Sequence, residues 1–152
     1  MSSFSFTETL RVGQIGGGRW GRKVLRNLAA LPAAEVVAVA DPVDPALAEA
    51  ARLVPAARAS RDADDVLRDA SIDAVAIATE TPLHAQLAEA ALDAGKHVFV
   101  EKPLAQTTEQ AARLVVLAEE RQRVLMVGHL LRYHPAFAYV ERLVAEGTLG
   151  EI

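Results

Sequence analysis

The sequence contains no cysteine among its 152 residues. This absence excludes disulfide bridges, thiolate metal sites and a cysteine nucleophile, and it is typical of a reducing compartment, so we expect a cytoplasmic protein without a metal site. No stretch approaches the ~18 continuous apolar residues that a membrane-spanning helix requires. Residues 1–9 lack the basic head and apolar segment of a secretory signal, so we interpret residues 1–10 as a flexible tail.

Basic charge is also scarce, because 16 Lys and Arg face 20 Asp and Glu and the net charge is −4. No run of basic residues could follow a phosphate backbone, so nucleic acid is excluded as a partner, and membranes are not expected either. Apolar residues make up 51% of the chain and charged residues 24%. That balance predicts one well-packed domain, which we place at residues 11–152 without internal repeats or linkers.

Short apolar runs alternate along the chain with longer segments of helical periodicity. We expect strands at residues 11–15, 36–40, 74–78, 97–100 and 124–127. A run near residues 57–59 is interrupted by Arg58, so that coil and edge strand both remain open there. Runs that are apolar on both faces are typical of parallel strands covered by helices on each side. The fold class is therefore α/β, with a doubly wound parallel sheet of the Rossmann type.

Three signals mark the ends of helices. Asp44 precedes Pro45 and is expected to be an N-cap, and Thr107 with Gln110 has the spacing of a capping box. Gly95 follows a helical apolar stripe and is expected to end that helix in the left-handed conformation.

A glycine-rich segment, RVGQIGGGRWG, follows the first predicted strand and opens a helix. Gly16, Gly18 and Gly21 have G-x-G-x-x-G spacing, and Arg19 and Trp20 lie inside the motif. The first glycine permits a tight turn, the second lets a pyrophosphate approach the backbone, and the third lets helix and strand pack closely. The N–H groups and dipole of the helix then attract the phosphates. This pattern predicts a dinucleotide site.

Asp41 ends the second predicted strand about 20 residues after the last glycine, where a carboxylate binds the ribose hydroxyls of the adenosine. Pro42 and Val43, which follow, offer no cation for a 2′-phosphate, so we predict NAD in preference to NADP. The alternative is that the glycines only form a tight loop and that Asp41 caps a turn.

Polar residues follow two other predicted strands. Ligands of open parallel sheets gather at the carboxyl ends of the strands, so these residues are expected beside the cofactor. The candidates are Thr79, Thr81, Pro82, His84, Glu101 and Lys102. Two interpretations of His84 remain open, because it could contact the cofactor or pack in the first turn of a helix.

The segment HVFVEKPLA, together with VGQIGGGRWG and AIATETPLHAQLAEAALDAGKHVFVEKPLA, resembles the glucose–fructose oxidoreductase/inositol dehydrogenase (GFO/IDH/MocA) family. The resemblance implies an NAD(P)-dependent oxidoreductase that transfers a hydride between nicotinamide and a hydroxyl-bearing carbon. It also implies that Lys102 is catalytic and orients or polarises the reacting oxygen, with Glu101 positioning the ribose or Lys102. Taken alone, the dipeptide would be ordinary surface charge, but its place at a strand end favours the functional interpretation.

The segment GHLLRYHP looks most like the nucleotide-sugar dehydrogenases of that family, which implies a sugar or nucleotide-sugar substrate. Arg132 would pair with a carboxylate or phosphate, and Tyr133 and His134 would line the same rim. Leu130 stands where many members have Asn. In the alternative interpretation Tyr133 is a core residue and His134 is solvated.

The resemblance also implies a second, antiparallel sheet domain with a catalytic Asp and His, which these 152 residues lack. We therefore expect little turnover from this chain alone, and an uncovered apolar surface on a helix at residues 135–146 that would permit a homo-oligomer. Two other functions remain: a stand-alone dinucleotide-binding module, and a scaffold without cofactor. The intact glycine motif, Asp41 and Lys102 argue against the scaffold.

Overall fold

The computed structural model describes residues 9–151, and its centre is one parallel sheet of six strands in the order β3-β2-β1-β4-β5-β6. The strands are β1 (Leu10–Ile15), β2 (Ala34–Ala40), β3 (Arg58–Ser60), β4 (Ala74–Ile77), β5 (His97–Val100) and β6 (Leu125–Val127). Every pairing in the sheet is parallel. This order is that of the Rossmann fold, so the predicted fold class is confirmed.

The five strands predicted with a single interpretation all form, each with bounds within two residues of those expected. The segment near residues 57–59, left open between coil and strand, forms the short edge strand β3. Arg58 is compatible with a strand there because an edge strand has an outer side that faces solvent. Residues 1–8 of the expected tail lie outside the described residues, and β1 begins within it, at Leu10.

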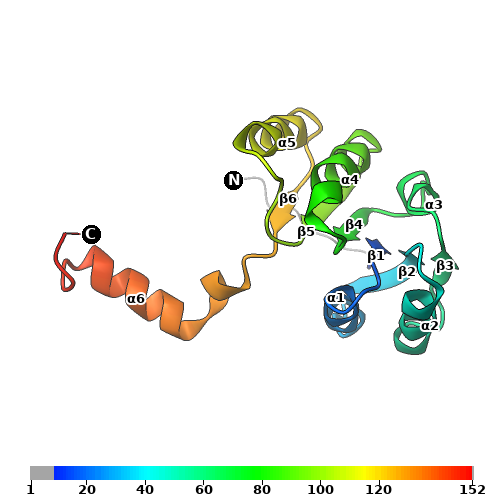
Figure 1. Cartoon of the computed structure of the whole chain (residues 1–152), viewed down its shortest axis with the longest axis horizontal. Helices are drawn as coiled ribbons and strands as arrows, with labels where there is room; N and C mark the ends of the chain where they lie inside the picture. Colours follow the sequence, from blue (N-terminus) through cyan, green and yellow to red (C-terminus); the bar gives the residue numbers. More distant parts are fainter. Residues whose placement is uncertain (1–8, 152) are drawn as a thin grey trace.

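Helices cover both faces of the sheet, as Figure 1 shows, with α1 and α2 on one side and α3, α4 and α5 on the other. The helices are α1 (Gly21–Ala29), α2 (Asp44–Leu53), α3 (Asp64–Leu67), α4 (Thr81–Asp93), α5 (Thr108–Glu120) and α6 (Pro135–Ala145), with a 3₁₀ turn η1 (Leu130–Tyr133). The four-residue α3 has no periodic signal of its own and was not predicted.

Each face of the sheet has its own apolar core. On the α4 and α5 side, Ile77, Leu92 and Leu114 are fully buried against one another. On the opposite side, Leu25 of α1 packs against Val39 of β2. Full burial of such side chains contributes about 1.5–3 kcal/mol each, so the two cores hold the helices against the strands and fix where the loops between them emerge.

Two of the three predicted helix-end signals are confirmed. The backbone N–H of Gln110 donates to the Thr107 hydroxyl at 3.2 Å, and Gly95 has a φ of 74°. The Asp44 prediction is wrong: α2 begins at Asp44 itself, its N-cap is Val43, and no side chain caps it. The Asp44 carboxylate binds Arg61 instead, which places the charge in the first turn, where it still favours the helix dipole.

The last helix, α6, extends away from the sheet (Figure 1), and none of its residues is buried. It presents exposed apolar side chains, among them Phe137, Tyr139 and Val140. Across residues 9–151, no helix combines the length and the hydropathy needed to span a membrane.

Candidate functional site

The sheet order brings the ends of β1 and β4 together, at the point where the chain connections pass to opposite faces. In α/β sheets ligands bind in the crevice outside the strand ends at such a point. A cavity of about 680 Å³ opens there, lined by residues from the ends of β1, β2 and β4, including Gly16, Gly18, Asp41 and Thr79. Cavities of about 420 and 470 Å³ adjoin it through the shared side chain of Trp20. Together they form an elongated crevice.

The three motif glycines have three different surroundings. Gly16 has a φ of 97°, and a Cβ there would meet the backbone oxygen of Ala78 at 2.5 Å. At Gly21 a Cβ would lie 2.1 Å from the Gly16 oxygen, so the loop and the helix are in direct contact. A Cβ on Gly18 would meet nothing within 4 Å. Gly16 and Gly21 are thus required by packing, whereas Gly18 borders open space.

Gln14, which was not predicted from the sequence, holds this loop through its side-chain amide. Its side chain is fully buried in β1, and its Nε2 donates to the carbonyl oxygens of Gly16 at 2.8 Å and of Gly21 at 2.9 Å. Its Oε1 accepts no hydrogen bond within the described part of the chain. The one local signal was a polar residue in an otherwise apolar run, and this pattern does not reveal its partners.

Asp41 is buried at the end of β2, and its carboxylate is fixed by the backbone. The Gly17 N–H donates to its Oδ2 at 2.7 Å and the Val43 N–H donates to its Oδ1 at 2.8 Å. Each carboxylate oxygen has two acceptor positions, so each retains one for a ligand hydroxyl. Asp41 therefore does brace a turn, as the alternative interpretation had it, and it also faces the cavity beside the glycine loop.

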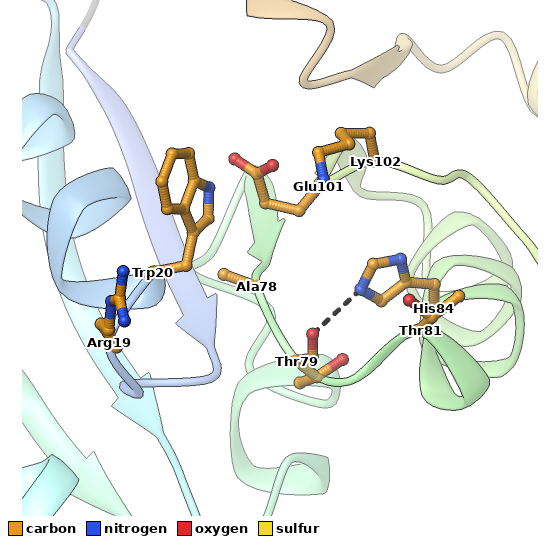
Figure 2. Close-up of a pocket in the computed structure, with 8 residues that line it drawn as sticks. All are labelled: Arg19, Trp20, Ala78, Thr79, Thr81, His84, Glu101 and Lys102. Carbon is orange, nitrogen blue, oxygen red and sulfur yellow. Dashed lines mark hydrogen bonds between the residues drawn. The ribbon is translucent and has the colours of Figure 1, made fainter.

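The middle cavity gathers most of the other predicted residues, as Figure 2 shows: Arg19, Trp20, Thr79, Thr81, His84, Glu101 and Lys102. Trp20 comes from the loop before α1, and the pair Glu101 and Lys102 comes from the end of β5. The Glu101 carboxylate points from the strand end toward the Trp20 ring in this view. Pro82, at the start of α4, lines none of the three cavities of the crevice.

His84 is buried and ties two loops together. Its Nε2 lies 3.1 Å from the carbonyl oxygen of Thr79, and its Nδ1 lies 2.7 Å from that of Pro103. Both partners are acceptors, so a neutral imidazole donates to one of them and an imidazolium donates to both. The ring joins the segment after β4 to the segment that carries Lys102. The structural interpretation of His84 is thus observed, at a position that also borders the cavity.

The acid and the base at the end of β5 differ in exposure. Glu101 is only 6% exposed, whereas Lys102 is exposed and precedes a cis peptide bond to Pro103. A Cβ on Gly128 would come within 3.1 Å of the Glu101 Oε1, so this glycine leaves the room that the carboxylate needs. Both charged side chains line the middle cavity and the one beyond it.

The residues proposed for substrate binding separate in the structure. Arg132 lines the outermost cavity and donates from Nη1 to Glu141 of α6 at 2.5 Å. His134 caps α6, because its Nδ1 accepts from the Ala136 N–H at 3.2 Å. Tyr133 is 74% exposed and lines none of these cavities, so the alternative that it is a core residue is wrong. Among the described residues, no group of three or more His, Asp or Glu could hold a metal.

Known proteins resemble this chain in sequence and in fold. UDP-N-acetylglucosamine 3-dehydrogenase from Acidithiobacillus ferrooxidans is 38% identical, over 88% of this chain and 41% of that protein. A scyllo-inositol dehydrogenase structure from Lactobacillus casei, with NAD(H) and scyllo-inositol, matches with a TM-score of 0.84 and 31% identity, over 95% of this chain and 43% of that one. The structure of KijD10, a 3-ketoreductase from Actinomadura kijaniata with NADP and TDP-benzene, matches with a TM-score of 0.85 and 33% identity, over 95% of this chain and 45% of that one.

The chain spans about two fifths of the length of the curated relatives it matches. Residues 10–129 match the family described as an oxidoreductase family with an NAD-binding Rossmann fold. All six strands, the glycine loop and the residues after β5 fall inside that range. This chain belongs to the GFO/IDH/MocA oxidoreductase family.

Proposed function

We propose that this chain is the cofactor-binding part of an NAD-dependent oxidoreductase acting on a hydroxyl of a sugar, polyol or nucleotide sugar. The observation that carries the proposal is the crevice at the strand ends, with the glycine loop and Asp41 at one end and Lys102 at the other. When bound, the nicotinamide would supply the hydride acceptor or donor. The chain's own residues would bind, orient and exchange protons.

The proposed cofactor-binding residues fit a dinucleotide along the crevice. The open space at Gly18 and the start of α1 suit the pyrophosphate, because the first N–H groups of a helix have no intrahelical partner. The remaining acceptor positions of Asp41 suit the two ribose hydroxyls of the adenosine half. Arg19, Trp20, Thr79, Thr81, His84 and Glu101 would surround the nicotinamide half, with Pro82 stiffening the start of α4.

Lys102 is the residue proposed to touch the reacting oxygen. An ammonium group can donate a hydrogen bond to an alkoxide as it forms, which stabilises the developing negative charge, and it can take part in proton transfer. Glu101, buried beside it, would hold the ammonium or a ribose hydroxyl in place. His84 would set the position of Lys102 through its contact with Pro103, without touching the substrate.

The substrate class is proposed from the relatives and from the outer cavity. The similar proteins include a scyllo-inositol dehydrogenase, a UDP-N-acetylglucosamine 3-dehydrogenase and a 3-ketoreductase seen with TDP-benzene, and these names share polyol, sugar and nucleotide chemistry. Arg132 lines the outer cavity and pairs with Glu141 of α6. Its guanidinium could leave Glu141 and bind a phosphate or carboxylate of the substrate. Tyr133 and His134 would contribute at most to the rim.

The experiment that tests the proposal is a calorimetric titration of the 152-residue chain with NADH and with NADPH. We expect saturable NADH binding and weaker NADPH binding. The matched variant is Gly18→Val: its side chain would enter open space, so thermal unfolding should change little, whereas NADH affinity should fall at least about tenfold because the pyrophosphate loses its place. Absence of NADH binding to the folded wild-type chain would contradict the proposal.

A further inference from the structure

A cation lies near Asp41 that the sequence does not place there. Strand β3 pairs with β2 so that Ser60 is opposite Ala40, and the Asp41 N–H donates to the Ser60 carbonyl oxygen at 3.0 Å. Arg61 therefore follows Ser60 at the same end of the sheet at which Asp41 follows Ala40. Both residues line the cavity of about 680 Å³ assigned above to the adenosine half of a dinucleotide.

The guanidinium of Arg61 is already engaged. Its Nε donates to Oδ1 of Asp44 at 2.7 Å and its Nη2 donates to Oδ2 at 2.5 Å, so the planar fork is used in a two-point pair. The hydrogen bond and the charge of Asp44 raise the pKa of Arg61 above its ordinary value, so the group stays cationic. A two-point pair of this kind has the geometry with which arginine binds phosphate.

The charges at this corner of the cavity oppose a second phosphate. Asp41 and Arg61 line the cavity and Asp44 pairs with Arg61, so two carboxylates and one guanidinium leave one net negative charge at this corner. A 2′-phosphate would meet this charge, and the arginine that could bind it is occupied. The other charged residues that line the cavity, Arg19 and Glu80, follow β1 and β4, whereas Asp41 follows β2, Asp44 opens α2 and Arg61 follows β3.

We infer that the Asp44–Arg61 pair is a determinant of cofactor selectivity, in which Asp44 withholds the guanidinium of Arg61 from the 2′-phosphate and thereby favours NAD over NADP. The inference rests on the proposed function, since it requires that a dinucleotide binds with its adenosine ribose at Asp41. It adds Arg61, about 20 residues after Asp41, as a latent phosphate ligand that becomes available when its partner is removed.

The test is a double-mutant cycle on the 152-residue chain, with NADH, NADPH and the adenosine fragments ADP and 2′,5′-ADP as calorimetric ligands. In Asp44→Asn the ratio of the NADPH to the NADH dissociation constant should fall about tenfold, because the two-point ion pair becomes at most one neutral hydrogen bond and one carboxylate charge is lost. The fragments should show the same change, since the effect requires only the adenosine half. In Asp44→Asn/Arg61→Gln the gain should disappear.

Two features keep the outcomes distinct. The side chains of the pair are 70% and 62% exposed, so the variants should fold like the wild type, and circular dichroism checks this. The matched control is Asp93→Asn, which removes the same charge from an exposed pair with Arg121 on the distant α4 and α5 helices and should leave the ratio unchanged. An unchanged ratio in Asp44→Asn, or a gain that persists without Arg61, would overturn the inference; failure of the wild type to bind NADH would overturn the proposed function itself.

Discussion

Replacing Gln14 by methionine tests the least expected part of the cofactor loop. Methionine has nearly the same length and shape as glutamine but no amide, so the substitution removes both hydrogen bonds to the loop without introducing a charge. The side chain is 0% exposed, so water cannot replace the lost donor. Any change in stability or cofactor affinity then reports on the two contacts with Gly16 and Gly21.

The expected magnitude follows from those contacts. Each hydrogen bond contributes about 1 kcal/mol net, so their loss costs about 2 kcal/mol. Removing the Oε1 atom, which is buried without a partner in the described part of the chain, offsets a fraction of this loss. The result should be a decrease of about 1–2 kcal/mol in the free energy of unfolding, which corresponds to a decrease in Tm of about 2–8 °C for a domain of this size.

The assay is urea unfolding followed by circular dichroism, with NADH titration of the same samples. Gln86→Met is the matched control, because Gln86 is exposed on α4 and the substitution there should change stability by less than about 0.5 kcal/mol. NADH affinity should fall in Gln14→Met and not in the control. Equal urea midpoints for Gln14→Met and the wild type would refute the argument that these bonds hold the loop.

Three further predictions concern charged residues. Asp41→Ala should narrow the preference for NADH over NADPH, measured as the ratio of dissociation constants, because it removes the carboxylate that binds the ribose and repels a 2′-phosphate. In an active enzyme that contains this chain, Lys102→Ala should lower kcat at least about hundredfold while the NADH dissociation constant stays within about fivefold. Burial lowers the pKa of Lys96 below 10.5, so the unfolded chain binds more protons between the two pKa values and stability should rise as pH approaches 10.5. Urea midpoints at several pH values should show this rise in the wild type and less of it in Lys96→Met.

Each of these has a result that would contradict it. An unchanged cofactor preference in Asp41→Ala would remove the assignment of the adenosine end. Loss of NADH affinity with normal turnover in Lys102→Ala would make that lysine a binding residue and not a catalytic one. Identical pH dependence of stability in Lys96→Met and the wild type would show that the buried ammonium, whose Nζ donates to the Asp69 and Ile72 carbonyl oxygens, carries no penalty.

The sheet could be predicted because its strands are buried on both faces. A run such as residues 74–77 is apolar throughout since helices cover it from both sides, and such runs are visible without any knowledge of neighbours. The glycine motif was equally apparent, because the positive φ of Gly16 and the close approach of Gly21 to the Gly16 oxygen are constraints within a few residues of the chain. The helix ends at Thr107 and Gly95 could also be predicted, because a capping hydrogen bond and a left-handed glycine involve only residues close together in the sequence.

The missed features depend on contacts between distant segments. Asp44 is of a residue type that often caps helices and it precedes a proline, yet its carboxylate accepts hydrogen bonds from Arg61, which lies 17 residues away along the chain. Gln14 could be recognised as unusual but not as the support of a loop, because its contact with Gly21 forms only when the start of α1 packs against β1. Similarly, the residues that follow Asp41 include no cation, and Arg61 comes to the same cavity only through the parallel pairing of β3 with β2.

Binding of a dinucleotide and the choice between NAD and NADP depend on different parts of the sequence. Local motifs specify that a dinucleotide can bind, since backbone N–H groups and glycines form the phosphate site and need few side chains. The choice between NAD and NADP depends on the charge close to one ribose hydroxyl, and Asp41, Asp44 and Arg61 are the residues proposed to set that charge here. Solved relatives seen with NAD(H) and with NADP share this fold at TM-scores of 0.84 and 0.85, so the fold does not decide between them. Cofactor selectivity therefore depends on side chains. The exposed pair proposed here, Asp44 and Arg61, can be changed without disturbing the neighbouring strands.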